Sequence, residues 1–319
     1  MSDDSLPGQM RSAATVLLKT LEGRQHALAV HSFADDAARR WIEYRPEPRP
    51  GACLADLSTE ARKAAHRLLA TGMSEHAYAQ AMVITALEEV LDRQEGWRRG
   101  RHSNDYWVNV FGDPGGDEPW AWRFEGHHLS VTMTLVGDEI SPAPIFLGAN
   151  PACVRYGDQP VSRPLPLEED LARELLTTLT PAQRSVAVVS DQAPFDICSA
   201  TSPRAAERVE PAGVSSSALN AASRELLLQL VALYLARMPD DLSGREMMRV
   251  GFNEFHFAWQ GPAAPGTRHY YRVQADDLLI EYDSTTEGGN HAHTVLRRPR
   301  SDFGDDVLAA HLSRDHGAA

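Results

Sequence analysis

The residues whose types and spacing best suit chemistry lie in one stretch near the C-terminus, EYDSTTEGGNHAH. It holds a pair of carboxylates, Glu281 and Asp283, at its start and a pair of histidines, His291 and His293, at its end, with one residue between the members of each pair. Side chains alternate along a β-strand, so the members of each pair share one face. We expect a hairpin with 284–290 as its loop, in which Asp283 pairs with His291. Glu281 then lies opposite His293, and all four polar side chains lie on the same face.

A second candidate is the segment EGHHLS, which holds Glu125, His127 and His128. Neighbouring residues on a strand point to opposite faces, so we expect only one of these two histidines to join a site, unless Gly126 forms a bulge. One of them, together with the two histidines of the first stretch, gives three imidazoles. Three imidazoles with an open position suit a divalent transition metal, and the ligand set leaves iron, copper, zinc and manganese as candidates.

The carboxylates near these histidines are the expected catalytic groups. Glu281, Asp283 and Glu125 are each suited to bind the ion, to orient an imidazole N–H or to transfer protons. Zinc would activate water for hydrolysis, whereas iron or copper would support redox chemistry. No hydrolase nucleophile motif such as GxSxG accompanies the histidines, which favours an oxidoreductase over a hydrolase. We therefore expect a metal-dependent enzyme that acts on a small molecule.

Two other interpretations of the same residues stay open. The histidines are also able to form hydrogen bonds with carboxylates only, or to lie on the surface without a joint role. The chain would then be a non-catalytic protein that binds a small molecule in an aromatic-lined pocket, around Trp107, Trp120, Trp122, Trp259 and Tyr270–Tyr271. The interpretations differ in whether a chelator lowers the thermal stability.

Two blocks of strands must position these residues. The aromatic and β-branched runs of about 105–147 indicate a β-meander, and the short segments of about 250–297 indicate further strands. Helical patterns occupy about 10–95, the region between the blocks, and about 305–314. We expect an α+β fold, with a largely antiparallel sheet from both blocks covered by N-terminal, central and C-terminal helices. No linker divides the chain, so residues 1–319 are expected to form a single domain.

Local signals give some of the helix bounds. Ser58 and Ser74 are expected to cap helices. Thr180 is expected to open a capping box. Periodic patterns predict a helix across Ala34–Ile42 and a strong helix from about Ser217 to Arg237.

The composition limits the partners and the compartment. Lys and Arg number 31 and Asp and Glu 44, a formal net charge of −13, which opposes binding to nucleic acid or to an anionic membrane. Three cysteines without a CxxC pair offer neither a disulfide framework nor a cysteine zinc site. The polar start MSDDSLPGQM lacks the pattern of a secretory signal, so we expect a cytoplasmic protein whose partner is a small-molecule substrate. The oligomeric state is left open.

Several blocks of the chain together carry a family resemblance: DYWVNVFG, WAWRFEGHHLSVTMTLV, IFLGANPA, FHFAWQG and the long segment from His269 to His316. Over about residues 15–316 the sequence resembles the family catalogued as domain of unknown function 3500. The family's name implies no activity, so the resemblance implies a shared fold. It also adds weight to the histidine site, because the recurrent blocks hold those residues. The family typically has Asn-Thr-Gln after the aspartate that matches Asp283, where this chain has Ser284-Thr285-Thr286.

Overall fold

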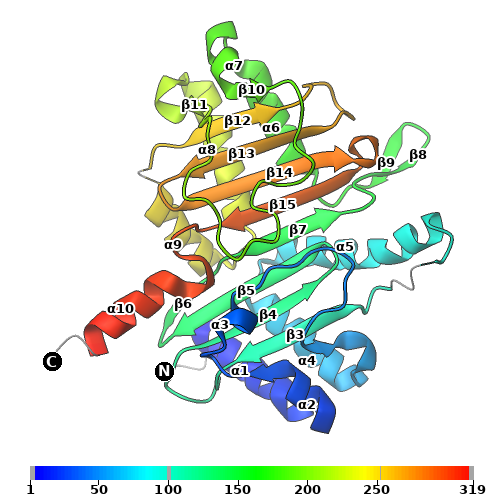
Figure 1. The fold of residues 1–319 in the computed structure, drawn as a ribbon, viewed down its shortest axis with the longest axis vertical. Helices are drawn as coiled ribbons and strands as arrows, with labels where there is room; N and C mark the ends of the chain where they lie inside the picture. Colours follow the sequence, from blue (N-terminus) through cyan, green and yellow to red (C-terminus); the bar gives the residue numbers. More distant parts are fainter. Residues whose placement is uncertain (1–3, 99–101, 252, 316–319) are drawn as a thin grey trace.

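A computed structural model describes residues 4–98, 102–251 and 253–315, which form an α+β fold around one large mixed sheet (Figure 1). Its main strands lie side by side in the order β1 (Val30–His31), β3 (Tyr106–Phe111), β4 (Trp120–Gly126), β5 (Leu129–Val136), β7 (Ile145–Ala149), β15 (His291–Arg297), β14 (Leu278–Thr286), β13 (His269–Ala275), β12 (His256–Gln260) and β10 (Val188–Ser190). The pairs β1–β3 and β10–β12 are parallel, and the other neighbours are antiparallel. The expected α+β fold with a mostly antiparallel sheet is confirmed.

Shorter strands complete the β-structure. The strands β2 (Ala52–Cys53), β6 (Glu139–Ser141) and β11 (Val214–Ser215) pair with β3, β5 and β12. A separate hairpin is formed by β8 (Val154–Tyr156) and β9 (Gln159–Ser162). The two expected strand blocks therefore join at β7 and β15, which pair in the middle of the sheet.

Helices cover one face of this sheet (Figure 1). The N-terminal group lies behind β3–β7 and comprises α1 (Leu6–Thr20), α2 (Gly23–Ala29), α4 (Thr59–Thr71) and α5 (Glu75–Gln94). The central group lies behind or above β12–β15 and comprises α6 (Pro166–Thr178), α7 (Pro181–Ala187), α8 (Ala221–Leu235) and α9 (Asp240–Val250), while α10 (Asp305–Asp315) follows the last strand. None of the helices in the described ranges combines the length and the apolar character needed to cross a bilayer.

Two irregular segments cover the opposite face of the sheet (Figure 1). The first cover is residues 32–51, whose only helix is α3 (Asp36–Arg39), and the second cover is residues 191–213, in which no helix or strand is assigned. The Oη atom of Tyr44 in the first cover donates a hydrogen bond to Asp196 in the second (2.9 Å). The two covers are thus tied to each other above the sheet.

The helix caps follow the local signals. The hydroxyls of Ser58 and Ser74 each accept a hydrogen bond from a backbone N–H three residues on, both at 3.2 Å. The capping box at Thr180 forms with Gln183. These three expectations are confirmed, because each depends only on residues within one turn of the helix start.

Other expected bounds were wrong. The helix expected over Ala34–Ile42 is only Asp36–Arg39, because the chain beyond it runs across the sheet as part of the first cover. The helix expected from Ser217 starts at Ala221, where Asn220 is the cap. The second strand block starts at His256, since Val250 still belongs to α9.

The two faces of the sheet differ in chemistry although both are buried. The helix face is mainly apolar, with Trp122, Phe124, Met133, Leu147 and Ile280 in the core. The covered face carries completely buried polar side chains: Asn109, Arg123, Glu125, Ser130, Thr132, Arg272, Glu281 and Arg297. The covers supply partners for this face, since backbone carbonyls accept from Arg123 (Ala38, 2.9 Å) and Arg297 (Ser202, 3.1 Å). Irregular segments offer the unpaired backbone groups that such a polar face requires.

Candidate metal centre

His127 and His128 form the turn between β4 and β5. The strands pair up to Gly126 and Leu129, which leaves these two histidines as a two-residue connection. His128 has a left-handed backbone, with φ of 61°. Our expectation that they lie on a strand and point to opposite faces was wrong, because the chain reverses between them. Their rings stack instead, with centroids 3.7 Å apart and an interplanar angle of 30°.

Two glycines and a tyrosine make room for this turn. The Oη atom of Tyr106 donates to the carbonyl of His127 (2.9 Å), and a Cβ at Gly126 would lie 2.2 Å from the Tyr106 ring. A Cβ at Gly148, on β7, would lie 2.8 Å from Cδ2 of His128. Both glycines therefore allow aromatic rings to lie directly on the backbone.

The second hairpin has a different register from the one we expected. Asp283 pairs with His293, and Thr286 with His291, across an irregularity in β14. The strand β14 continues to Thr286, and a 3₁₀ turn over Glu287–Gly289 completes the connection. The expected pairs Asp283–His291 and Glu281–His293 were wrong because these three extra strand residues shift the pairing by two. A shift of two keeps side chains on the same face, so Asp283 and His293 still meet.

The histidines of the two hairpins converge beside β7. The Nε2 atoms of His128 and His291 are 2.8 Å apart. The His293 ring centroid lies 4.7 Å from that of His291 and 5.4 Å from that of His128. The expected proximity of the two hairpins is therefore confirmed.

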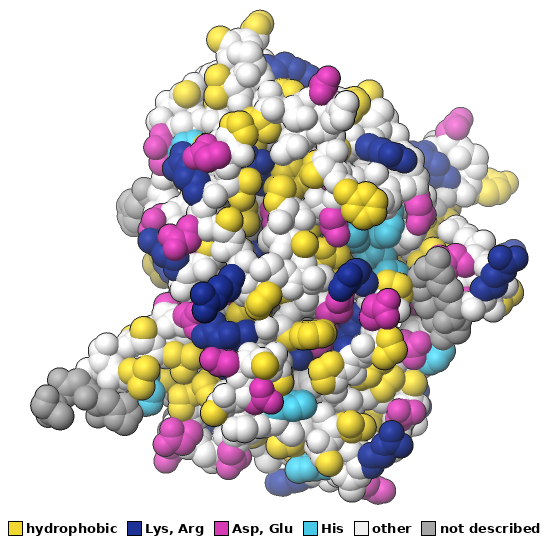
Figure 2. Space-filling model, viewed as in Figure 1, with side chains coloured by type: hydrophobic (Ala, Val, Ile, Leu, Met, Phe, Trp, Pro, Cys, Tyr) yellow, Lys and Arg dark blue, Asp and Glu magenta, His cyan; other side chains and the backbone are white. Residues whose placement is uncertain are grey.

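The cluster is open to solvent on one side. Figure 2 shows histidine side chains gathered in a hollow of the covered face, near the ends of β7, β14 and β15. The side chains of His291 and His293 are 17% and 12% exposed, whereas that of His128 is 2% exposed. Two of the three rings thus keep a small exposed surface.

Two carboxylates hold the inner nitrogen of His293. Its Nδ1 atom lies 3.1 Å from Oδ2 of Asp283 and 3.1 Å from Oδ1 of Asp196. Burial opposes protonation of this ring, but the two carboxylates outweigh burial and raise the pKa of His293 to about 9. Burial also raises the pKa of Asp283, which the charge of His293 only partly offsets. Because Nδ1 faces the carboxylates, Nε2 is the nitrogen that remains for a ligand or a metal.

His291 has a polar neighbour on its inner side as well. Its Nδ1 atom lies 3.3 Å from the amide nitrogen of Asn150 and 3.6 Å from Oε1 of Glu287. The Asn150 amide donates to the same Glu287 oxygen (2.8 Å). The ring is therefore oriented with Nε2 towards His128.

The other expected carboxylates have partners of their own. Glu281 lies on the same face as Asp283, but it accepts the N–H groups of Cys198 (2.6 Å) and Ser199 (3.1 Å) in the second cover. Glu125 accepts from Nε of Arg123 (2.7 Å), and burial raises the pKa of its carboxyl. The structure brings Asp283 into the histidine cluster and binds Glu281 and Glu125 to other groups.

Sequence reasoning missed three carboxylates near the histidines, one of which is Glu287 in the hairpin loop beside His291. Glu88 on α5 lies 2.7 Å from Nδ1 of His127, and Asp196 in the second cover contacts His293. Glu88 lies in an ordinary helical pattern and Asp196 in an irregular segment, so neither has a local signal. The closest approach to a local signal is that Glu88 lies among the buried, mostly apolar positions of its helix.

The sequence as a whole matches a known family model. The model described as a protein of unknown function (DUF3500) matches residues 5–305, nearly the whole chain. The chain belongs to the DUF3500 family. No curated protein and no solved structure matches it. The resemblance seen in the sequence blocks is therefore confirmed.

In this DUF3500 protein, three groups of side chains within the described residues offer ligand atoms close enough to share an ion. The atoms of each group lie within 4.8 Å of one another, and the groups are His128, His291 and His293; Glu88, His127 and His128; and Asp196, Asp283 and His293. The three groups form one continuous cluster, because His128 and His293 each belong to two of them.

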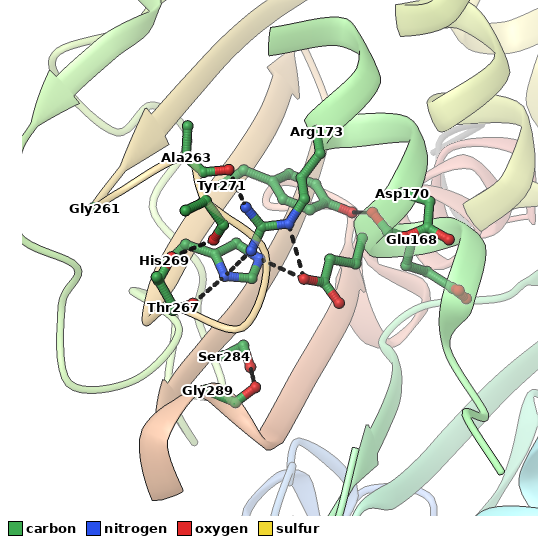
Figure 3. Close-up of polar contacts among 12 residues, drawn as sticks. Glu168, Asp170, Arg173, Gly261, Ala263, Thr267, His269, Tyr271, Ser284 and Gly289 are labelled. Atoms are coloured by element: carbon green, nitrogen blue, oxygen red, sulfur yellow. Dashed lines mark hydrogen bonds and ion pairs between the residues drawn. The ribbon is translucent and has the colours of Figure 1, made fainter. Parts of the chain in front are cut away.

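A second polar cluster lies on the helix face and has no ligand-like geometry. Figure 3 shows Arg173 of α6 between β13 and the 261–267 loop. Its guanidinium contacts Glu169 (2.9 Å), the carbonyl of Ala263 (2.5 Å) and Nδ1 of His269 (3.0 Å). His269 is stacked between Trp259 and Tyr282. Burial, together with the charge of Arg173, lowers the pKa of His269 to about 4, so this ring is a neutral part of the core.

Proposed function

We propose that this protein is a metal-dependent enzyme that acts on a small molecule, with a divalent transition metal bound by His128, His291 and His293. The observation that carries the proposal is the convergence of these three imidazoles, which offer ligand atoms within 4.8 Å of one another. Two imidazole nitrogens that bind one ion at about 2.1 Å each lie roughly 3 to 3.5 Å apart. The 2.8 Å between Nε2 of His128 and Nε2 of His291 is close to that separation.

The groups behind the rings support the same assignment. Metal-binding histidines usually direct the other ring nitrogen to a carboxylate, which fixes the ring and increases its basicity. His293 has this arrangement with Asp283 and Asp196, whereas Nδ1 of His291 is hydrogen-bonded to the Asn150 amide nitrogen and lies 3.6 Å from Glu287. An ion that binds His293 takes the place of the proton this ring otherwise carries.

The ligand set decides what chemistry the ion would supply. Iron, copper, zinc and manganese all accept three imidazoles, with the remaining positions open to water or substrate. We favour a redox reaction over hydrolysis, because the chain has no hydrolase nucleophile motif beside the histidines. In this proposal Asp283 orients His293, Glu281 holds the second cover in place, and Glu125 balances Arg123.

Elemental analysis of the purified chain tests the proposal. After reconstitution with each of the four metals in turn and dialysis, we expect at least about one bound equivalent of the preferred ion. The double variant His291→Ala, His293→Ala should bind one equivalent less than the wild type, while His76→Ala, which changes an exposed histidine of α5, should match the wild type. Less than about a tenth of an equivalent for every metal would rule out a dedicated site.

The alternative of an aromatic-lined binding pocket receives no support from the side chains. Trp120, Trp122, Trp259, Tyr270 and Tyr271 are all completely buried and expose no surface to a ligand. Trp107, the remaining aromatic residue of the expected pocket, is partly buried. Under this alternative a chelator would leave the thermal stability unchanged, whereas under our proposal it lowers the melting temperature.

A further inference from the structure

Glu88, His127 and His128 form a second group of potential ligands next to the first. Oε1 of Glu88 lies 2.7 Å from Nδ1 of His127 and 3.9 Å from Nδ1 of His128. All three residues are buried, with Glu88 3% exposed and His128 1% exposed. One carboxylate oxygen and two imidazole nitrogens at these separations match the N and O donor set of zinc or copper.

The two nitrogens of the His128 ring face different groups. Nε2 lies against His291, and Nδ1 points to Glu88. The stacked ring of His127 directs its own Nδ1 to the same glutamate. A single imidazole thus stands between two sets of ligands.

The backbone is held in an uncommon state to produce this arrangement. A left-handed φ at a non-glycine residue costs free energy and persists only where the surroundings demand it. At His128 the left-handed φ is required by the two-residue hairpin turn, which also brings the two stacked rings next to Glu88. Burial of the Glu88 carboxylate beside these rings costs free energy unless its negative charge is offset.

The charges of the whole cluster point the same way. Four carboxylates surround the four histidines, namely Glu88, Asp196, Asp283 and Glu287. One divalent ion at His128, His291 and His293 offsets two of these negative charges. A second ion beside Glu88 offsets two more, and the bridging imidazolate adds one negative charge.

We propose that Glu88, His127 and His128 bind a second divalent transition-metal ion and that the His128 imidazole bridges the two ions. The inference rests on the proposed function for the first ion. Because a bridging ring binds a metal through both nitrogens, it releases its remaining N–H proton to solvent when the second ion enters. The site is then a two-metal centre in which α5 supplies one ligand.

Zinc stoichiometry separates this inference from the proposed function. For the full chain loaded with Zn²⁺ and dialysed, we expect about two equivalents, and about one in Glu88→Gln or His127→Phe. Glu89→Gln is the matched control, because it removes the same charge from the adjacent, exposed residue of α5. The double variant His291→Ala, His293→Ala should retain about one equivalent beside Glu88.

The outcomes are distinguishable. If the wild-type chain saturates at one equivalent and Glu88→Gln still binds it, the second site is refuted and the proposed function stands. If both bind two, the second ion lies elsewhere and the inference is also refuted. If nothing binds to any variant, the proposed function fails with it. The His127→Phe variant keeps the ring stack, and circular dichroism establishes that each variant is folded.

Copper gives an independent test of the bridge. Two Cu²⁺ ions joined by one imidazolate are magnetically coupled. The electron paramagnetic resonance signal of the copper-loaded wild-type chain should therefore be far weaker than the signal of two isolated Cu²⁺ ions. Glu88→Gln should show the full signal of one isolated ion. Full intensity from two uncoupled ions in the wild-type chain would refute the bridging role of His128.

Discussion

At the scale of single residues, the space beside His128 is as important as the ring itself. Gly148 lies directly under it, and a Cβ there would also lie 2.9 Å from the carbonyl of Ala292 and 3.2 Å from Cδ2 of His293. The glycine thus lets two rings from different hairpins lie against β7. Side chains packed this closely leave no space for an added atom.

We expect Gly148→Ala to disturb the site more than its size suggests. The new methyl must displace His128 and His293, so metal affinity should fall at least about tenfold, and the free energy of unfolding should fall by about 1–3 kcal/mol. Competition with a chelator and urea unfolding measure the two effects. Gly244→Ala in α9 is the control, since a Cβ there meets nothing within 4 Å. Equal metal affinity in both variants would contradict the prediction.

Tyr106→Phe tests the support of the turn. The change removes the hydroxyl that donates to the carbonyl of His127 and keeps the ring over Gly126. A buried carbonyl without its partner costs about 1–3 kcal/mol of stability, and the turn should hold its histidines less firmly. The melting temperature of the apo protein and its metal affinity should both decrease. Tyr156→Phe, on an exposed tyrosine, should change neither.

At the scale of elements, local patterns predicted much of this fold and only part of the site. Helix starts at Ser58, Ser74 and Thr180 were predictable because capping is decided within one turn. The parity of Asp283 and His293 was predictable because strands alternate. The pairing register was not, since β14 pairs with β13 as well as with β15, and the hairpin sequence alone does not show the irregularity in β14.

The missing carboxylates show a second limit. Glu88 reaches His127 from a helix 39 residues earlier in the chain, and Asp196 reaches His293 from a segment 97 residues earlier. Such contacts depend on how α5 and the second cover pack on the sheet, which no local pattern encodes. Two adjacent histidines also read as strand, although here they are the turn.

The second cover should depend on Glu281. Its carboxylate accepts two backbone N–H groups of this segment and the Tyr270 hydroxyl, and charge-assisted bonds of this kind contribute about 1.5–3 kcal/mol each. We expect Glu281→Gln to lower stability by about that amount and to speed proteolysis within 191–213. Because Asp196 belongs to the same segment, metal affinity should also fall. Glu174→Gln, on an exposed residue of α6, should match the wild type in all three measurements.

At the scale of the whole molecule, the sheet separates two kinds of polar chemistry. The covered face holds the histidine cluster, which is open to solvent, and the helix face holds His269, whose ring is sealed between aromatic side chains. The same residue type therefore has opposite protonation behaviour on the two faces, since the pKa is raised to about 9 at His293 and lowered to about 4 at His269.

The low pKa of His269 predicts a loss of stability in acid. Between the unfolded value of 6.5 and the folded value of about 4, the unfolded chain takes up a proton that the folded chain excludes. This part of the stability is present above pH 6.5 and is lost as the pH falls towards 4, by about 3 kcal/mol. Urea unfolding over this pH range should show a shallower dependence in His269→Phe. Parallel curves for the two proteins would contradict the assignment.

The junction between β7 and β15 gives the histidine cluster a further meaning. It is the place where the two strand blocks meet, and His128 stands on one block while His291 and His293 stand on the other. An ion shared by these rings would act as a cross-link between residues 163 positions apart. By loop-closure entropy alone, a link over that span restricts the unfolded chain by about 5 kcal/mol. When the ends of the chain are pulled apart, β7 and β15 should therefore separate first in the apo protein. The metal-loaded protein should need a higher force to separate these two strands.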